Sequence, residues 1–385
     1  MHKSFFLGIS CCILLACSSP AQELKKQEQA QTPLNIIVSN RVQMEQDANK
    51  AEILALYKTY LLSNPESSEE NPYWNTQEQE KYVQFNLSLP YLFQGFGSKM
   101  LSRYMDLYVM SIEASGKERY TLRVQYQMKG GLQNGSSIWC IHQVDTIKKN
   151  EKWVLQNFLV QKTENWKQES IGNINYRFSP DYTFKAEKAN AAAQFVDSLK
   201  SLFELESSSS PIDYYLVKNA DELGELMGFD YFFVGYTTGI TKAEIGNIYT
   251  SSGEFHAHEL VHLVLHQETV KRHFLLEEGI AEFLGSKLQN PDKYHKEREM
   301  LIHDLKNKVG FTISSILEGK MAYDGYNYKY AFGAVICELV YQEKGIEGLK
   351  KIINSNSSSN NELLNLIYST LEIETAVQLV NLLSE

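Results

Sequence analysis

Two histidines and a glutamate stand close together in the sequence His258-Glu259-Leu260-Val261-His262. Residues four apart on a helix lie about 40° apart around its axis, so both imidazoles can bind one metal ion from the same face. Glu259, about 100° from His258, can reach a water molecule beside that ion without binding the ion itself. The spacing therefore predicts a hydrolytic metal site with zinc as the ion and Glu259 as the general base.

The residues around this motif are apolar on almost every face of the expected helix, from Phe255 to Leu265. Such a helix is expected to be buried, and burying two imidazoles and a carboxylate costs free energy unless a partner satisfies them. A metal ion is such a partner. The alternative is that His258 and His262 are core histidines satisfied by hydrogen bonds.

A second motif follows downstream, Glu278-Gly279-Ile280-Ala281-Glu282, with its two carboxylates on one helical face. In this order the two motifs resemble the thermolysin-like gluzincins of the peptidase MA clan. The resemblance covers roughly residues 166–385. It implies that Glu278 is the third zinc ligand and that Glu282 hydrogen-bonds a ligand histidine from outside the ligand set. The metzincin pattern is not met, because Leu265 and Glu268 stand where it requires Gly and His.

The same resemblance implies a zinc-dependent peptidase that hydrolyses peptide bonds in a peptide or protein substrate. A tyrosine is expected to stabilise the oxyanion, and Tyr326, Tyr328 and Tyr330 precede a helix expected over 331–344. Of these we select Tyr330. The rival function is a catalytically silent, peptidase-like lipoprotein that binds peptides or serves as a scaffold; loss of Glu259 would indicate it, and Glu259 is present.

Neighbouring residues have simpler interpretations. Glu277 lies about 100° from Glu278 on the expected helix, which predicts a solvated side chain. His256 is expected to face away from the histidine pair and to have no role. Glu282 has the alternative of being a surface carboxylate on an amphipathic helix. The small Gly279 and Ala281 are expected to let the two metal-binding helices approach closely.

The elements that must position this site are expected to be a small mixed sheet followed by a mostly helical lobe. Strands are expected over 171–178, over 212–217 and within 231–249, and nearly all residues beyond 251 have helical periodicity. Ser251-Ser252-Gly253-Glu254 has the spacing of a capping box and predicts a helix start. A helix is expected between the first two of these strands, because apolar residues there recur at helical spacing. These residues are Ala189, Ala192, Val196, Leu199 and Phe203.

The first half, residues 48–164, is expected to be a separate α+β domain. Residues 49–61 have helical spacing, residues 120–128 alternate between apolar and polar, and further strands are expected over 138–144 and 153–162. A helix followed by a curved antiparallel sheet resembles the NTF2-like fold. No group of residues here predicts catalysis.

The N-terminus has the features of a lipoprotein signal peptide over residues 1–16. A short apolar run ends in Leu14-Leu15-Ala16-Cys17, which resembles the bacterial lipobox and implies a lipid anchor on Cys17. An ordinary signal peptide with a chance cysteine is the alternative. Residues 17–47 are expected to be a flexible tether, and residues 165–385 the peptidase-like domain. The expected location is the cell envelope, at the outer membrane.

Composition restricts the partners further. The net charge of −10 and the lack of a basic stripe argue against nucleic acid. Of the five cysteines, Cys140 and Cys337 alone lie in the expected folded body, in different domains, so both are expected to be buried thiols and not a disulfide.

Overall fold

The computed structural model is α+β, as expected from the sequence. Cys17 and the signal segment, the polar loop at 207–210 and Tyr326 lie outside the residues that the structure describes. Within the described residues no helix has both the length and the apolar character that crossing a membrane requires. The described residues are 34–44, 47–63, 71–81, 85–92, 101–132, 135–206, 211–319 and 328–384.

The first half contains a sheet in which consecutive strands are antiparallel, apart from one parallel edge pair. Its strands, in the order in which they pair, are β1 (Ile36–Val38), β2 (Met105–Gly116), β3 (Arg119–Met128), β4 (Ile138–Lys149) and β5 (Lys152–Gln156). The edge strand β1 belongs to the stretch expected to be tether, so residues 34–44 are part of the folded domain.

The expected strand over 153–162 is too long, because the chain leaves the sheet after Gln156. Asn157 donates hydrogen bonds from its backbone and its side chain to Glu78, which ends the strand, and a short helix follows. The helix α2 packs on the sheet through Ile53, Tyr57 and Tyr60, as its periodicity predicts. The helices of this half are α1 (Asn40–Met44), α2 (Ala48–Leu62), α3 (Thr76–Lys81), α4 (Leu89–Leu92), α5 (Leu101–Tyr104) and α6 (Phe158–Lys162).

A second, mixed sheet supports the site. In spatial order its strands are β10 (Gly239–Lys242), β11 (Asn247–Thr250), β8 (Ile212–Leu216), β7 (Ile174–Phe178) and β6 (Lys167–Ile171). The central strand β8 is parallel to both of its neighbours, whereas β10 and β6 are antiparallel to theirs. The helix α7 (Ala186–Leu202) buries its predicted apolar stripe.

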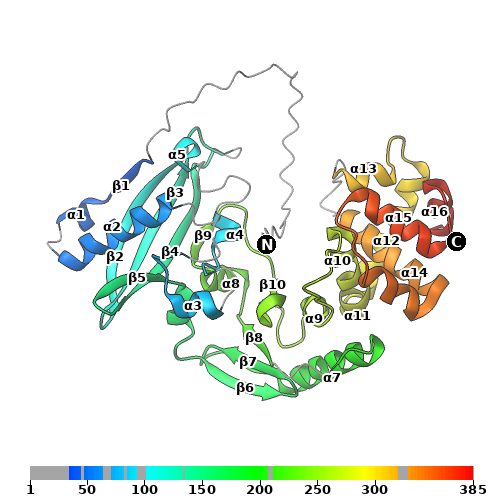
Figure 1. Ribbon diagram of the computed structural model, residues 1–385, viewed down its shortest axis with the longest axis horizontal. Coiled ribbons are helices and arrows are strands. Elements are labelled where there is room, and N and C mark those ends of the chain that lie inside the picture. Colours follow the sequence, from blue (N-terminus) through cyan, green and yellow to red (C-terminus); the bar gives the residue numbers. More distant parts are fainter. Residues whose placement is uncertain are drawn as a thin grey trace.

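One strand of the second half joins the sheet of the first half. After β8 the chain forms α8 (Ala220–Leu226) and then β9 (Phe229–Phe232), which pairs antiparallel with β4. Phe229 and Phe232 lie in one apolar core with the side chains of the first sheet. The two halves therefore share a core at this junction, and β9 leads directly to the edge strand β10 (Figure 1).

The rest of the chain is a helical lobe, on the other side of the molecule from the first sheet (Figure 1). Its longest helix, α14, has a break at Gly345, whose φ of 64° is in the left-handed region. The loop expected at 354–361 is confirmed up to Ser359. The elements are α9 (Ala257–Val264), α10 (Phe274–Ala281), the π-helical η4 (Glu282–Ser286), α11 (Lys287–Gln289), α12 (Pro291–Asn307), α13 (Ile313–Leu317), α14 (Tyr328–Ile353), α15 (Asn360–Leu371) and α16 (Ala376–Leu382).

Candidate metal centre

The helix α9 carries the first motif, but it does not begin where the capping-box spacing predicts. It starts at Ala257, with His256 as its N-cap residue. Gly253 adopts a φ of 85°, and the carboxylate of Glu254 accepts a hydrogen bond from the backbone N of Lys185 at 2.7 Å. The Glu254 side chain therefore caps a different segment, and the turn delays the start of α9.

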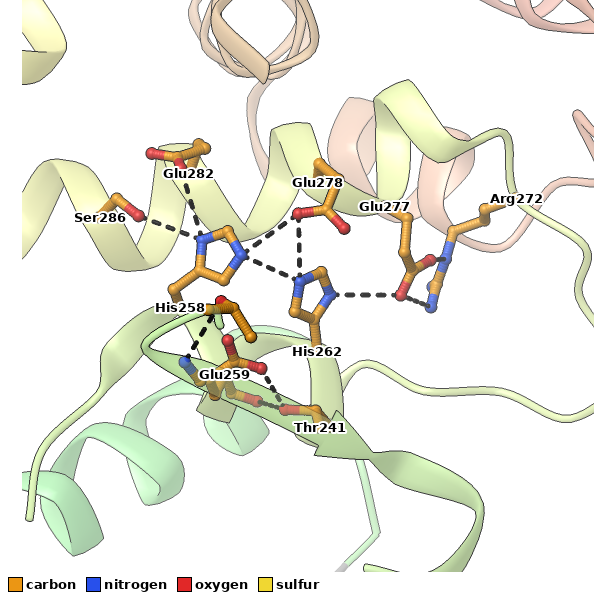
Figure 2. Close-up of polar contacts among 11 residues, drawn as sticks. Thr241, His258, Glu259, His262, Arg272, Glu277, Glu278, Glu282 and Ser286 are labelled. Atoms are coloured by element: carbon orange, nitrogen blue, oxygen red, sulfur yellow. Dashed lines mark hydrogen bonds and ion pairs between the residues drawn. The ribbon is translucent and has the colours of Figure 1, made fainter. Parts of the chain in front are cut away.

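Three side chains from α9 and α10 converge on one point (Figure 2). The Nε2 atoms of His258 and His262 are 3.1 Å apart. Oε2 of Glu278 lies 3.3 Å from Nε2 of His258 and 3.5 Å from Nε2 of His262. These atoms form a nearly equilateral triangle, and the three residues could together hold a metal ion.

The size of the triangle is informative. Ligands held by a tetrahedral ion at about 2.0–2.1 Å lie about 3.3–3.4 Å from one another, from the geometry of a tetrahedron. The three observed separations, 3.1–3.5 Å, bracket that value. Two imidazoles and one carboxylate therefore have the spacing of one face of a tetrahedral site, and the fourth position is not filled by a residue of this group.

The outer nitrogen of His258 has two oxygen neighbours from η4. Its Nδ1 lies 3.1 Å from Oγ of Ser286 and 3.6 Å from Oε1 of Glu282 (Figure 2). Glu282 thus lies at the outer nitrogen of His258, as expected, but Ser286 is the closer partner. The π-helical turn brings both side chains to the imidazole. Gly285 permits this approach, because a Cβ there would lie 2.6 Å from the backbone N of His258.

The outer nitrogen of His262 faces a second carboxylate. Its Nδ1 lies 3.5 Å from Oε1 of Glu277, and Glu277 in turn pairs with Arg272 at 2.5 Å. Glu277 is partly exposed, at 31% of its side chain, and is not a member of the metal-binding group, but it is also held by Arg272, whose side chain is only 3% exposed. Arg272 also donates to the carbonyl of Leu265 at the end of α9. Each of the two imidazoles therefore has an oxygen neighbour at the nitrogen facing away from the centre.

Opposite charges dominate the electrostatics of the cluster. Burial opposes charge on His262, but Glu277 and Glu278 outweigh it and raise the pKa of the imidazole to about 10. Burial likewise opposes charge on the two carboxylates, but the histidines, and Arg272 beside Glu277, lower the pKa of each to about 2. Both glutamates are therefore ionised at neutral pH, and Glu278 presents a charged oxygen to the point where the three side chains meet.

Glu259 points to the side of α9 that faces the edge strand β10 (Figure 2). Its Oε2 accepts a hydrogen bond from Oγ1 of Thr241 at 2.6 Å, and its Oε1 lies 2.5 Å from the position that a Cβ on Gly239 would occupy. Gly239 and Thr241 are alternate residues of β10 and face the same side. The carboxylate, whose residue is 7% exposed, is thus held by one hydroxyl and given space by one glycine.

Tyr330 belongs to the first turn of α14 and faces the same centre. Burial raises the pKa of its hydroxyl well above the usual range, and the nearby carboxylate of Glu278 raises it further. Tyr328, the other candidate that the structure describes, donates a hydrogen bond to Asp304 at 2.8 Å and has a structural role. The structure thus brings Tyr330, and not Tyr328, to the metal-binding group.

Gly279 was expected to let α10 approach α9, but it faces a different helix. A Cβ on Gly279 would lie 2.3 Å from the backbone of Gly333 in α14, so this glycine serves the crossing of α10 with α14. The glycine that lets a second helical segment approach α9 is Gly285. His273 caps α10 through its side chain and lies 2.9 Å from Oδ1 of Asn360.

No protein-family model and no curated protein matches this sequence. The assignment of the site therefore depends on its geometry.

Sequence reasoning missed several residues of the centre. Ser286 continues the four-residue spacing of Glu278 and Glu282, and that spacing could have identified it. Thr241 and the Arg272–Glu277 pair had no such signal, because each meets α9 through a long-range contact.

Proposed function

We propose that the protein is a zinc-dependent peptidase with a gluzincin-like catalytic domain. The observation that carries the proposal is the triangle of His258, His262 and Glu278, whose edges match a tetrahedral face with bonds of zinc length. Two imidazole nitrogens and one carboxylate oxygen form a donor set that zinc accepts in hydrolytic sites, where a fourth position stays open. The outer partners of both histidines support the same conclusion.

The residues of the chain have separate roles in this proposal. A bound zinc ion lowers the pKa of a water ligand to about 7 and polarises a carbonyl oxygen. Glu259 accepts the proton of the attacking water and returns it to the leaving amine, and Thr241 fixes the orientation of its carboxylate. Tyr330 donates a hydrogen bond to the oxygen on which negative charge develops.

A peptide is the substrate class that best suits the surroundings. The strand β10 is the last in the order of its sheet and borders Glu259. An extended chain can add to such an edge by main-chain hydrogen bonds, which places its peptide bonds beside the carboxylate.

The test combines metal analysis with cleavage of a diverse peptide pool and of envelope extract, scored by new termini in mass spectrometry. The wild type is expected to bind one zinc ion per chain and to cleave. E259Q is expected to keep zinc and to lose about 10²–10⁴-fold in rate, whereas H262A and E278A are expected to lose zinc and activity together. E268Q is a matched control for charge loss. Zinc binding without cleavage by the wild type would favour a silent peptide-binding lipoprotein.

The location and the first domain are part of the proposal. We expect a chain that begins at an acylated Cys17, anchored at the outer membrane, with an NTF2-like domain over residues 48–164. Mass spectrometry of the mature protein from the membrane fraction tests the anchor. A soluble protein that starts at another residue, or that keeps residues 1–16, would contradict it.

A further inference from the structure

His256, which the sequence gave no reason to select, lies beside Glu259. The centroid of its ring is 6.3 Å from that of His258. Its Cε1 atom lies 2.5 Å from the position that a Cβ on Gly239 would occupy, and Oε1 of Glu259 lies at the same distance from that point. The imidazole and the carboxylate thus flank one glycine of the edge strand β10. Both therefore contact the edge strand that is proposed to pair with a peptide.

The orientation of the His256 ring is fixed by hydrogen bonds. Its Nδ1 lies 2.9 Å from Oγ1 of Thr250. The Thr250 hydroxyl has one proton, and it donates that proton to the carbonyl of Thr238 at 2.9 Å. Nδ1 must therefore carry the hydrogen and donate to Thr250. The backbone N of His256 is also held, because it donates to the hydroxyl of Tyr214 at 2.9 Å.

This arrangement leaves one ring atom available. Nε2 of His256 forms no hydrogen bond with the part of the chain that the structure describes, and the residue is partly exposed. It is also not a member of the metal-binding group. With Nδ1 protonated, Nε2 of the neutral ring is a hydrogen-bond acceptor. An unused acceptor held rigidly beside Glu259 is available to an N–H or O–H group of a bound molecule.

We propose that Nε2 of His256 accepts a hydrogen bond from a backbone N–H of the bound peptide, at a residue adjacent to the scissile bond. The inference rests on the proposed peptidase function. A main-chain N–H is the donor that nearly every peptide residue supplies, and proline is the exception. His256 therefore disfavours proline, or an N-methylated residue, at one position of the substrate.

The variant that isolates Nε2 is H256N. The asparagine amide keeps a donor near the position of Nδ1 for Thr250, but it has no atom at the position of Nε2. Peptide affinity is measured by fluorescence anisotropy with a labelled peptide from the cleaved pool, using zinc-loaded E259Q so that the peptide stays intact. H256N in this background is expected to weaken binding about three- to tenfold, the effect of one hydrogen bond. Zinc content and melting temperature are expected to be unchanged.

A scan with N-methylated peptides provides an independent measurement. One N-methyl position is expected to weaken binding to E259Q by a similar factor and to have no further effect in E259Q/H256N, because both changes remove the same bond. Additive losses at every position would overturn the proposal. So would unchanged affinity of H256N, or a loss of zinc or folding by that variant, which would show a structural role. If the wild type neither cleaves nor binds any peptide, the peptidase proposal itself fails. If the wild type cleaves normally and one of the three contradicting results is found, only the role of His256 is rejected.

Discussion

Gly239 determines how close β10 can come to the carboxylate of Glu259. In G239A the new methyl group would lie 2.5 Å from both Oε1 of Glu259 and the His256 ring, so at least one of them must move. Displacement of a reacting group by about 1 Å can cost about 10²-fold in rate. We expect kcat/KM for peptide cleavage to fall by at least tenfold with zinc fully retained. G116A, where a Cβ meets only ordinary contacts, is the control and should cleave normally.

The variant Y330F tests the contribution of the Tyr330 hydroxyl alone, because it removes the hydroxyl and keeps the ring. The ring packs edge-to-face on Phe274 at 5.5 Å, and this contact survives the change. Removal of one donor to a developing oxyanion costs about 10²–10³-fold in kcat. We expect a loss of that size with little change in KM, zinc content or stability, measured by steady-state kinetics. Y328F is the matched control. A fall in zinc content would show instead that the hydroxyl supports the ligand Glu278.

At the scale of elements, the crossing of α10 and α14 places Glu278 and Tyr330 on the same side of the centre. A Cβ on Gly333 would lie 1.9 Å from the carbonyl oxygen of Leu275, so G333A must separate the two helices. Overpacking of this kind costs about 1–3 kcal/mol. We expect a lower melting temperature by calorimetry and weaker zinc binding by chelator competition. C337A, a buried change in the same helix, should lower stability but retain zinc affinity.

The elements also show which features the sequence could predict. The stripe of α7 and the spacing of His258 and His262 are local patterns, so periodicity was sufficient to predict a buried helix face and two imidazoles that converge on one point. The predicted start of α9 was wrong, because the Glu254 carboxylate accepts a hydrogen bond from Lys185, a residue far away in the sequence. The prediction that Gly279 faces α9 was also wrong, since a glycine in a sequence does not indicate which helix will approach it.

At the scale of the whole molecule, the two halves are joined through β9 and the residues beside it. Ser88 of the first half donates a hydrogen bond to the carbonyl of Met227 at 2.6 Å, and the backbone N of Gln143 donates to Gly228 at 2.7 Å. Asp230 of β9 pairs with Arg123 of β3. No local pattern could predict that a strand after residue 165 completes a sheet formed before it. The first domain therefore helps to hold β10, and with it Glu259, in place.

Two buried carboxylates in the first domain make the stability of the protein depend on pH. Burial raises the pKa of Glu78 to about 7, although hydrogen bonds from Asn157 oppose the shift. Burial also raises the pKa of Asp145 to about 7, and the charge of Glu78 contributes. The folded state therefore binds these protons more tightly than the unfolded state, where carboxyl groups titrate near pH 4. Their contribution to stability is fully present below about pH 4 and is lost as the pH rises through about 7.

E78Q tests this dependence, because glutamine is neutral at every pH and keeps an oxygen for the donors that Glu78 Oε2 binds. Those donors are the indole of Trp74 at 3.0 Å and the backbone N of Asn157 at 2.7 Å. We expect E78Q to match the wild type at about pH 4 and to exceed it at pH 8.5 by up to about 3 kcal/mol in the free energy of unfolding, from urea titrations followed by circular dichroism. E169Q, an exposed control, should leave the pH dependence unchanged. Equal stability of E78Q and the wild type at pH 8.5 would show that Glu78 stays ionised in the folded protein at no cost.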